Sequence, residues 1–165
     1  FFFLCVPLEG DPDPRAPRQP STEWRFHQSV LNARPDQSFV VHAHPAHATA
    51  IAVQRRHIPA CHYMIAAFGG TDVPLVDYAL FGSAELAQMV TKATVDRTAC
   101  LMANHGAITM GETLARALWR MEELENLARV YLLASSTGTP KILTDAQMEE
   151  VIVAFGSYGP KTEQP

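Results

Sequence analysis

The stretch SFVVHAHPAHATAIAVQ, residues 38–54, contains a short apolar run that ends in two histidines. A run of small apolar residues follows directly. Residues 38–44 are predicted to form a strand, and residues 46–54 a tightly packed helix. Positions i and i+2 of a strand point to the same face, so His42 and His44 leave the strand end in one direction. Two imidazoles placed in this way suit one metal ion such as zinc, although ordinary polar positions also fit an isolated pair of this kind.

Further short strands and helices are predicted along the rest of the chain. Strands are expected over residues 60–67, 99–103 and 107–110, and a loop over 71–82. Helices are expected from Ser21 or Thr22 to Arg34, from Ser83 to Val95, from Thr113 to Thr137, and from Thr144, with Gln147 as its capping-box partner, to Phe155. This alternation indicates an α/β domain of two or three layers around one sheet.

Two of these helices carry apolar stripes. In the first, Trp24, His27 and Leu31 are spaced at i, i+3 and i+7, which predicts a buried face. In the longest helix, the stripe that begins with Leu114 and continues through Leu118, Met121 and Leu124 is interpreted as a core or subunit contact.

The composition is that of one soluble globular domain over residues 1–165, with 47% hydrophobic and 18% charged residues. A net charge of −4, without a basic stripe or a cationic amphipathic stretch, argues against nucleic-acid and membrane partners. Three cysteines without a CxxC motif indicate a cytoplasmic protein without a disulfide framework. The opening run FFFLCV is interpreted as a buried strand of a domain whose N-terminal part is missing, and residues 160–165 as a flexible tail.

A third histidine and a carboxylate extend the pattern. His105 lies in Asn104-His105-Gly106, a predicted tight turn between two strands, where it can point into a cleft. Three histidines from two strand ends match a catalytic zinc site with one open position. Glu23 lies in the first turn of a predicted helix, where an acid can also simply complement the helix dipole. The same helix start offers two hydroxyls and free N–H groups, which suit a phosphate.

The remaining histidines have weaker claims as ligands. His47 is expected to pack or to make an outer contact, and His57 to lie in a surface loop. His62 alternates with Tyr63 in the predicted strand, so the two are expected to face opposite ways. Tyr63 and Tyr158 are candidate proton donors, although tyrosine is more often a packing residue.

Several motifs, in this order, resemble the class II aldolase/adducin superfamily, and its aldolase-like members most. The similar segments are PSTEWRFH at 20–27, RPDQSFVVHAHPAHATA at 34–50, IPACHYMIAAFGG at 58–70, NHG at 104–106, RALWRMEELENLARVYL at 116–132 and FGSYG at 155–159. The resemblance implies a single three-layer domain with a central, mainly antiparallel sheet flanked by helices. It also implies a lyase that cleaves a ketose 1-phosphate, such as L-fuculose 1-phosphate, to dihydroxyacetone phosphate and an aldehyde.

The resemblance further implies a role for each metal-site candidate. His42, His44 and His105 would hold one Zn²⁺ per chain, which would stabilise an enediolate as a Lewis acid. Glu23 would ligate or neighbour the metal at rest and then act as the general base.

Substrate contacts and assembly follow from the same resemblance. Ser21 and Thr22 would help to hold the phosphate of the sugar-phosphate substrate, and Phe81 and Tyr158 would line the pocket. Tyr63 would reach into the site of a neighbouring subunit and donate a proton to the aldehyde oxygen. The implied assembly is a homotetramer with its sites between subunits.

Three alternatives stay open at this point. One is a pentulose-phosphate 4-epimerase or another sugar-phosphate lyase of the same fold, although family epimerases usually carry Asp where this chain has Glu23. Another is a metal-free, adducin-like interaction module. The third is a catalytically impaired fragment, because known members carry a longer N-terminal part that supplies much of the phosphate pocket.

Overall fold

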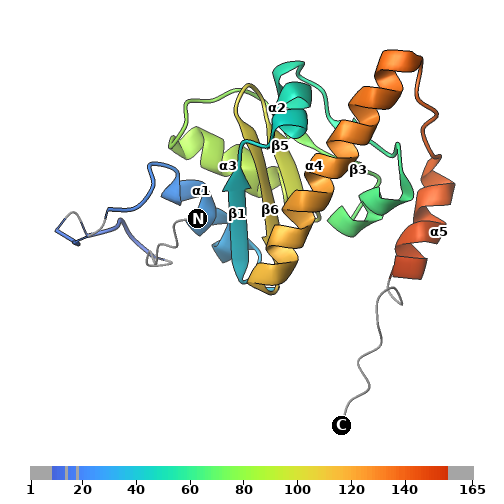
Figure 1. The fold of residues 1–165 in the computed structure, drawn as a ribbon. Coiled ribbons are helices and arrows are strands. Elements are labelled where there is room, and N and C mark those ends of the chain that lie inside the picture. The colour runs from blue at the N-terminus through green and yellow to red at the C-terminus, as the bar shows by residue number, and fades with distance from the viewer. Residues whose placement is uncertain (1–8, 14, 18, 156–165) are drawn as a thin grey trace, which may run out of the picture.

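The computed structural model describes residues 9–13, 15–17 and 19–155, and its centre is a four-stranded sheet (Figure 1). The strands are β1 (Phe39–Ala43), β2 (Ile58–Pro59), β3 (Asp72–Val73), β4 (Leu75–Val76), β5 (Ala99–Met102) and β6 (Gly106–Gly111). The central order is β1-β6-β5-β4, with the first two pairings antiparallel and the last one parallel. β2 and β3 form a separate antiparallel pair. The prediction of a mainly antiparallel central sheet is therefore confirmed.

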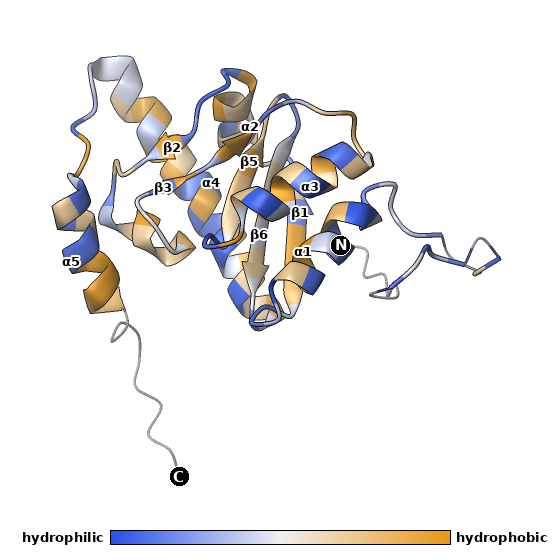
Figure 2. Ribbon diagram, turned by 180° about the vertical axis from the view of Figure 1, so that it is seen from behind, coloured by the Kyte–Doolittle hydropathy of each residue, from blue (hydrophilic) through white to orange (hydrophobic). Residues whose placement is uncertain are grey.

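Helices cover both faces of this sheet, so the domain has the predicted three layers (Figures 1 and 2). The helices are α1 (Trp24–Ala33), α2 (Ala46–Val53), α3 (Ala84–Ala93), α4 (Leu114–Thr137), α5 (Asp145–Phe155) and the 3₁₀ helix η1 (Tyr63–Phe68). One apolar cluster joins α1 and α3 to Cys100 and Met102 of β5, and the other joins α2 and α4 to Ala99 and Leu101 of the same strand. Successive β5 side chains thus enter opposite cores, as strand alternation requires.

Several predicted helix boundaries are confirmed by their capping bonds. The hydroxyls of Ser83 and Thr113 each accept a backbone N–H of the following turn at 3.1 Å, in α3 and α4 respectively. At the start of α5, Thr144 N–H donates to Gln147 Oε1 at 2.9 Å, and Gln147 N–H donates to Thr144 Oγ1 at 3.3 Å. This is the reciprocal capping box that the sequence predicts.

The start of α1 differs from its prediction. The helix begins at Trp24, because the chain first makes a turn in which Trp24 N–H donates to the Ser21 carbonyl at 3.1 Å. Ser21 Oγ accepts the N–H of Glu23 at 3.3 Å, inside that turn. Neither Ser21 nor Thr22 is therefore the residue that caps α1, and both lie exposed just before it.

The buried face of α1 is also different from the predicted one. Phe26 and Val30, spaced at i and i+4, are fully buried in the cluster shared with α3. Trp24, His27 and Leu31 are only half-buried. The predicted stripe is a neighbouring row on the same helix, and packing against α3 brings the row of Phe26 and Val30 into the core.

Residues 60–67, predicted as a strand, instead contain most of the 3₁₀ helix η1. A short apolar run buried on all sides has no period that distinguishes a strand from a helix. His62 Nδ1 accepts the N–H of Met64 at 3.2 Å and starts η1, and Gly69, at φ 90°, ends it. The prediction that His62 and Tyr63 face opposite ways is therefore wrong, since their ring centroids lie 4.7 Å apart.

The segment predicted as a loop over 71–82 contains β3 and β4. Each has only two residues, too few to show any alternation in the sequence. Within the described residues no helix is both long and apolar enough to cross a membrane. Cys61 and Cys100 are free thiols, and Cys5, Tyr158 and the predicted tail lie outside the described residues.

The first turn of α2 is capped by a residue from another helix. Its N-cap position is Pro45, whose side chain accepts no hydrogen bond. Glu125 of α4 supplies the missing acceptor: its carboxylate receives the N–H of His47 at 3.0 Å and of Ala48 at 2.9 Å. His47 Nδ1 lies 2.7 Å from the same carboxylate. α4 therefore holds the N-terminus of α2 where a local Ser, Thr, Asp or Asn would ordinarily do so.

This contact leads us to expect that part of the stability of the metal-free protein is lost in acid. Burial alone would raise the pKa of Glu125, but hydrogen bonds from His47 and Ala48 outweigh it and lower the pKa below 4.5. A depressed carboxyl pKa contributes stability above the unfolded value, and this contribution is lost as pH falls through the folded one. A protonated Glu resembles Gln. In EDTA, we therefore expect the wild type to have a larger free energy of unfolding than Glu125→Gln by about 1 kcal/mol at neutral pH, and this difference should fall toward zero in acid. A difference that persists unchanged into acid would contradict this expectation.

Candidate metal centre

His42 stands near the end of β1, where pairing with β6 orients its ring. In the ladder His42 is opposite Ile108 and Ala43 is opposite Ala107. His42 Nδ1 lies 3.0 Å from the Ala107 carbonyl, which can only accept, so Nδ1 carries the proton. The lone pair is then on Nε2, and a backbone bond of this kind is the usual means of orienting a histidine ligand.

Gly106 allows the two histidine-bearing segments to approach each other. A Cβ at this position would lie 2.5 Å from the Ala43 carbonyl and 2.5 Å from the His44 ring. Two residues earlier, Asn104 has φ 56°, a conformation that Asn tolerates better than most residues. The sequence Asn-His-Gly therefore makes a tight turn and leaves room for His44 beside it.

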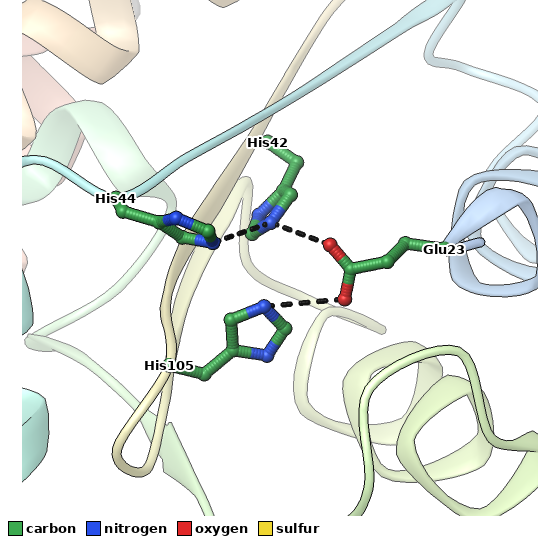
Figure 3. Close-up of side chains that lie close together, drawn as sticks. All are labelled: Glu23, His42, His44 and His105. Atoms are coloured by element: carbon green, nitrogen blue, oxygen red, sulfur yellow. Dashed lines mark hydrogen bonds and ion pairs between the residues drawn. The ribbon is translucent and has the colours of Figure 1, made fainter. Parts of the chain in front are cut away.

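The structure brings the three predicted ligands and Glu23 together (Figure 3). One donor atom of each of Glu23, His42, His44 and His105 lies within 4.8 Å of all the others. Glu23 Oε2 is 2.8 Å from His42 Nε2, and Glu23 Oε1 is 3.1 Å from His105 Nε2. The Nε2 atoms of His42 and His44 are 3.1 Å apart. Glu23 reaches this point from the turn before α1, so three separate segments supply the donors.

The electrostatics of the cluster favour the forms that bind metals. Burial would raise the pKa of Glu23, but the rings of His105 and His42 beside it, when they carry a positive charge, lower it well below its ordinary range. For His44, burial is the main cause that lowers the pKa, and the charges of His42 and His105 act in the same direction. Nearby on α1, burial and then the charge of His42 lower the pKa of His27 to about 4.

The donor atoms fit a divalent cation, because the atoms that face one another carry lone pairs without enough protons between them. With Nδ1 of His42 protonated, a neutral His42 turns the lone pair of Nε2 toward both a carboxylate oxygen and the His44 ring. Glu23 Oε1 is buried and finds no aligned hydrogen-bond donor among the described residues, although His105 lies close to it. A cation among these four groups satisfies all of them, and three imidazoles with one carboxylate are a donor set that suits zinc.

The predicted phosphate-binding residues lie next to this cluster. Ser21, Thr22 and Phe81 line one open hollow of about 380 Å³. Arg25 also lines it, donates to the Gly82 carbonyl at 3.2 Å and stacks on the Trp24 ring. Sequence reasoning did not single out Arg25, although its position two residues after Glu23 placed it near the site.

Tyr63 is not part of the cluster within one chain. It lies at the start of η1 with 44% of its surface exposed, and its ring centroid is 6.5 Å from that of Phe155 on α5. Tyr158 lies outside the described residues.

The other histidines have partners outside the cluster. His47 contacts Glu125, and His57, which is exposed, contacts Asp72 at 2.9 Å. His62 caps η1. Their predicted separation from the metal-ligand group agrees with this arrangement. The sequence analysis did not identify Glu125, although Pro45 at the start of a helix is a signal that its cap must come from elsewhere.

The fold and this site define a class of protein. Residues 3–132 match the family described as Class II Aldolase and Adducin N-terminal domain, and the chain belongs to this family. The resemblance inferred from the sequence is thereby confirmed, and with it the class of enzyme, a lyase of the class II aldolase type.

The chain is similar to several named aldolases of sugar phosphates. The chain is 42% identical over 158 residues to a 5-methylthioribulose-1-phosphate/5-deoxyribulose-1-phosphate aldolase of Rhodospirillum rubrum, covering 96% of this chain and 72% of the relative. It is 40% identical over 158 residues to the L-fuculose phosphate aldolase of Escherichia coli K12, covering 95% and 74%. A solved structure of an L-fuculose 1-phosphate aldolase matches with a TM-score of 0.81 and 40% identity, over 84% of this chain and 65% of that one. The chain thus spans slightly less than two thirds of that solved structure.

Proposed function

We propose that this chain is the catalytic domain of a zinc-dependent aldolase that cleaves a ketose 1-phosphate to dihydroxyacetone phosphate and an aldehyde. The observation that carries the proposal is the position of Glu23. Its carboxylate lies 2.8 Å from His42 in a cluster of three histidines. The two residues that precede it, Ser21 and Thr22, line the open hollow. The similarity to aldolases that are named for ketose 1-phosphates supports the same substrate class.

Each residue has a role in the proposed reaction. His42, His44 and His105 hold the metal, which when bound polarises the carbonyl oxygen of the substrate as a Lewis acid. In the addition direction Glu23 removes a C–H proton beside the carbonyl of dihydroxyacetone phosphate. The electron pair of that C–H bond forms the new C–C bond to the aldehyde carbon, and the aldehyde oxygen takes a proton from Tyr63 to become a hydroxyl.

Substrate binding belongs to the hollow beside Glu23. Ser21 and Thr22 present hydroxyl groups there, in the turn that precedes α1, and these suit phosphate oxygens. The proposed site assigns the phosphate of the substrate to them and its pocket walls to Phe81 and Tyr158.

The proposed function includes an assembly. Tyr63 is exposed and lies on η1, which packs against α5, α4 and β3, so its proposed role is in the site of a neighbouring subunit. We propose a homotetramer with its sites between subunits, as the resemblance to the class II aldolases implies. We also propose a cytoplasmic location, in line with the free thiols of Cys61 and Cys100.

The test is aldol cleavage by the purified chain. With zinc bound, we expect dihydroxyacetone phosphate to be released from L-fuculose 1-phosphate or 5-deoxyribulose 1-phosphate, measured by coupled reduction with NADH. A chelator should abolish the release and added zinc should restore it. Ribulose 5-phosphate serves as the control substrate, with xylulose 5-phosphate as its readout, because its conversion would assign an epimerase instead. Cleavage that survives both chelation and Glu23→Gln contradicts the proposal.

A further inference from the structure

Helix α2 directly follows the segment that carries His42, in β1, and His44, just after β1. Only Pro45 separates His44 from the first residue of α2, Ala46. Any rotation or fraying of the first turn of α2 therefore moves the backbone of His44. The side chain at the N-cap offers no bond that could prevent this movement.

Glu125 prevents it from the outside. Both oxygens of its carboxylate are used: Oε1 receives the N–H of His47 at 3.0 Å, and Oε2 receives the N–H of Ala48 at 2.9 Å. The neighbours of Glu125 on α4 fix its own position, because Leu124, Leu127 and Ala128 are at most 1% exposed in the core. The acceptor that holds α2 is thus mounted on a rigid helix.

The far end of α2 is tied to the third histidine. Asn104 N–H donates to the Ala52 carbonyl at 3.4 Å, and Arg55 Nε donates to Asn104 Oδ1 at 3.1 Å. Asn104 immediately precedes His105. The helix thus connects the segment that carries His44 to the turn that carries His105, and Glu125 holds the end nearer His44.

We infer that Glu125 is a positioning residue of the metal centre: by holding the N-terminus of α2 it fixes the distance between His44 and the other donors. This inference rests on the proposed function, in which these residues bind zinc. Outer contacts that orient metal ligands typically change metal affinity by 10- to 100-fold when they are removed. Glu125 acts one helical turn from His44, so the lower part of this range applies.

The experiment measures zinc binding without any activity assay. Metal-free wild type, Glu125→Gln and the matched control Glu122→Gln are titrated with zinc in competition with a chromophoric chelator. Glu122 is exposed on the same helix, so its variant removes the same charge without touching α2. We expect the zinc Kd of Glu125→Gln to rise roughly 10-fold above that of Glu122→Gln. The visible spectrum of bound Co²⁺ should change in Glu125→Gln alone.

A second pair of variants covers the case in which Glu125→Gln does not fold. Glu125→Asp keeps the charge and withdraws the carboxylate by one methylene, and Glu122→Asp is its control. Weaker zinc binding by Glu125→Asp than by Glu122→Asp supports the inference, because only the position of the charge differs. Equal Kd values and Co²⁺ spectra within each pair, with normal wild-type binding, overturn this inference alone. A wild-type chain that binds no zinc overturns the metal centre and this inference with it.

Discussion

Replacing His42 by alanine is expected to leave the protein without bound zinc and without aldol cleavage. His42 is the central donor of the cluster, since its Nε2 lies 2.8 Å from Glu23 and 3.1 Å from His44. Its ring is also the one held by the backbone of β6, through Ala107. Loss of an outer contact costs 10- to 100-fold in metal affinity, and loss of a ligand should cost more than about 100-fold.

The measurement is metal content after dialysis against metal-free buffer, by elemental analysis. We expect about one zinc per chain in the wild type and less than about a tenth of this in His42→Ala. His57→Ala is the matched control, because His57 is exposed and pairs with Asp72 outside the cluster. Circular dichroism shows whether both variants keep their helices. A folded His42→Ala chain that retains one zinc and cleaves substrate would disprove the assignment of His42.

Local rules are sufficient to predict the pair His42 and His44, whereas the approach of His105 depends on the pairing of β1 with β6. His42 and His44 are two positions apart at the end of a regular strand, so alternation puts them together. Asn104-His105-Gly106 predicts a tight turn from the residue types alone. The close approach of His44, which requires a glycine at position 106, is visible only in the structure. For Glu23 the sequence leaves open a dipole partner or a metal-site residue, and its distances of 2.8 Å to His42 and 3.1 Å to His105, which support the second, come from residues far away in the chain.

Other features depend on residues far apart in the chain and on burial from all sides. Glu125 caps a helix 77 positions earlier, and no local pattern connects the two. Residues 60–67 were predicted as a strand but contain most of the 3₁₀ helix η1, because a short apolar run packed against α4, α5 and β3 carries no period that distinguishes a strand from a helix. For α1, the sequence offers two adjacent rows, and packing against α3 selects Phe26 and Val30.

The second large effect is expected from Glu23→Gln, which separates metal binding from proton transfer. Gln has nearly the same shape as Glu and the three histidines remain, so at saturating zinc the variant should still contain one metal ion per chain. Gln cannot accept a proton, however, and the loss of a general base typically lowers the rate by 10²- to 10⁴-fold. We therefore expect kcat for cleavage to fall within this range while zinc content is unchanged.

A direct readout of the base is exchange of the C–H proton of dihydroxyacetone phosphate with D₂O, followed by NMR. This exchange needs no aldehyde and no C–C bond formation, so it reports only the step assigned to Glu23. It should be fast in the wild type and in Glu122→Gln, and slower by roughly 10²-fold or more in Glu23→Gln. If zinc-loaded Glu23→Gln exchanges the proton as fast as the wild type, the general base is another residue. Equal loss of exchange and of cleavage would leave Glu23 as the single group that takes the proton beside the metal, since the substitution changes one charge and almost no volume.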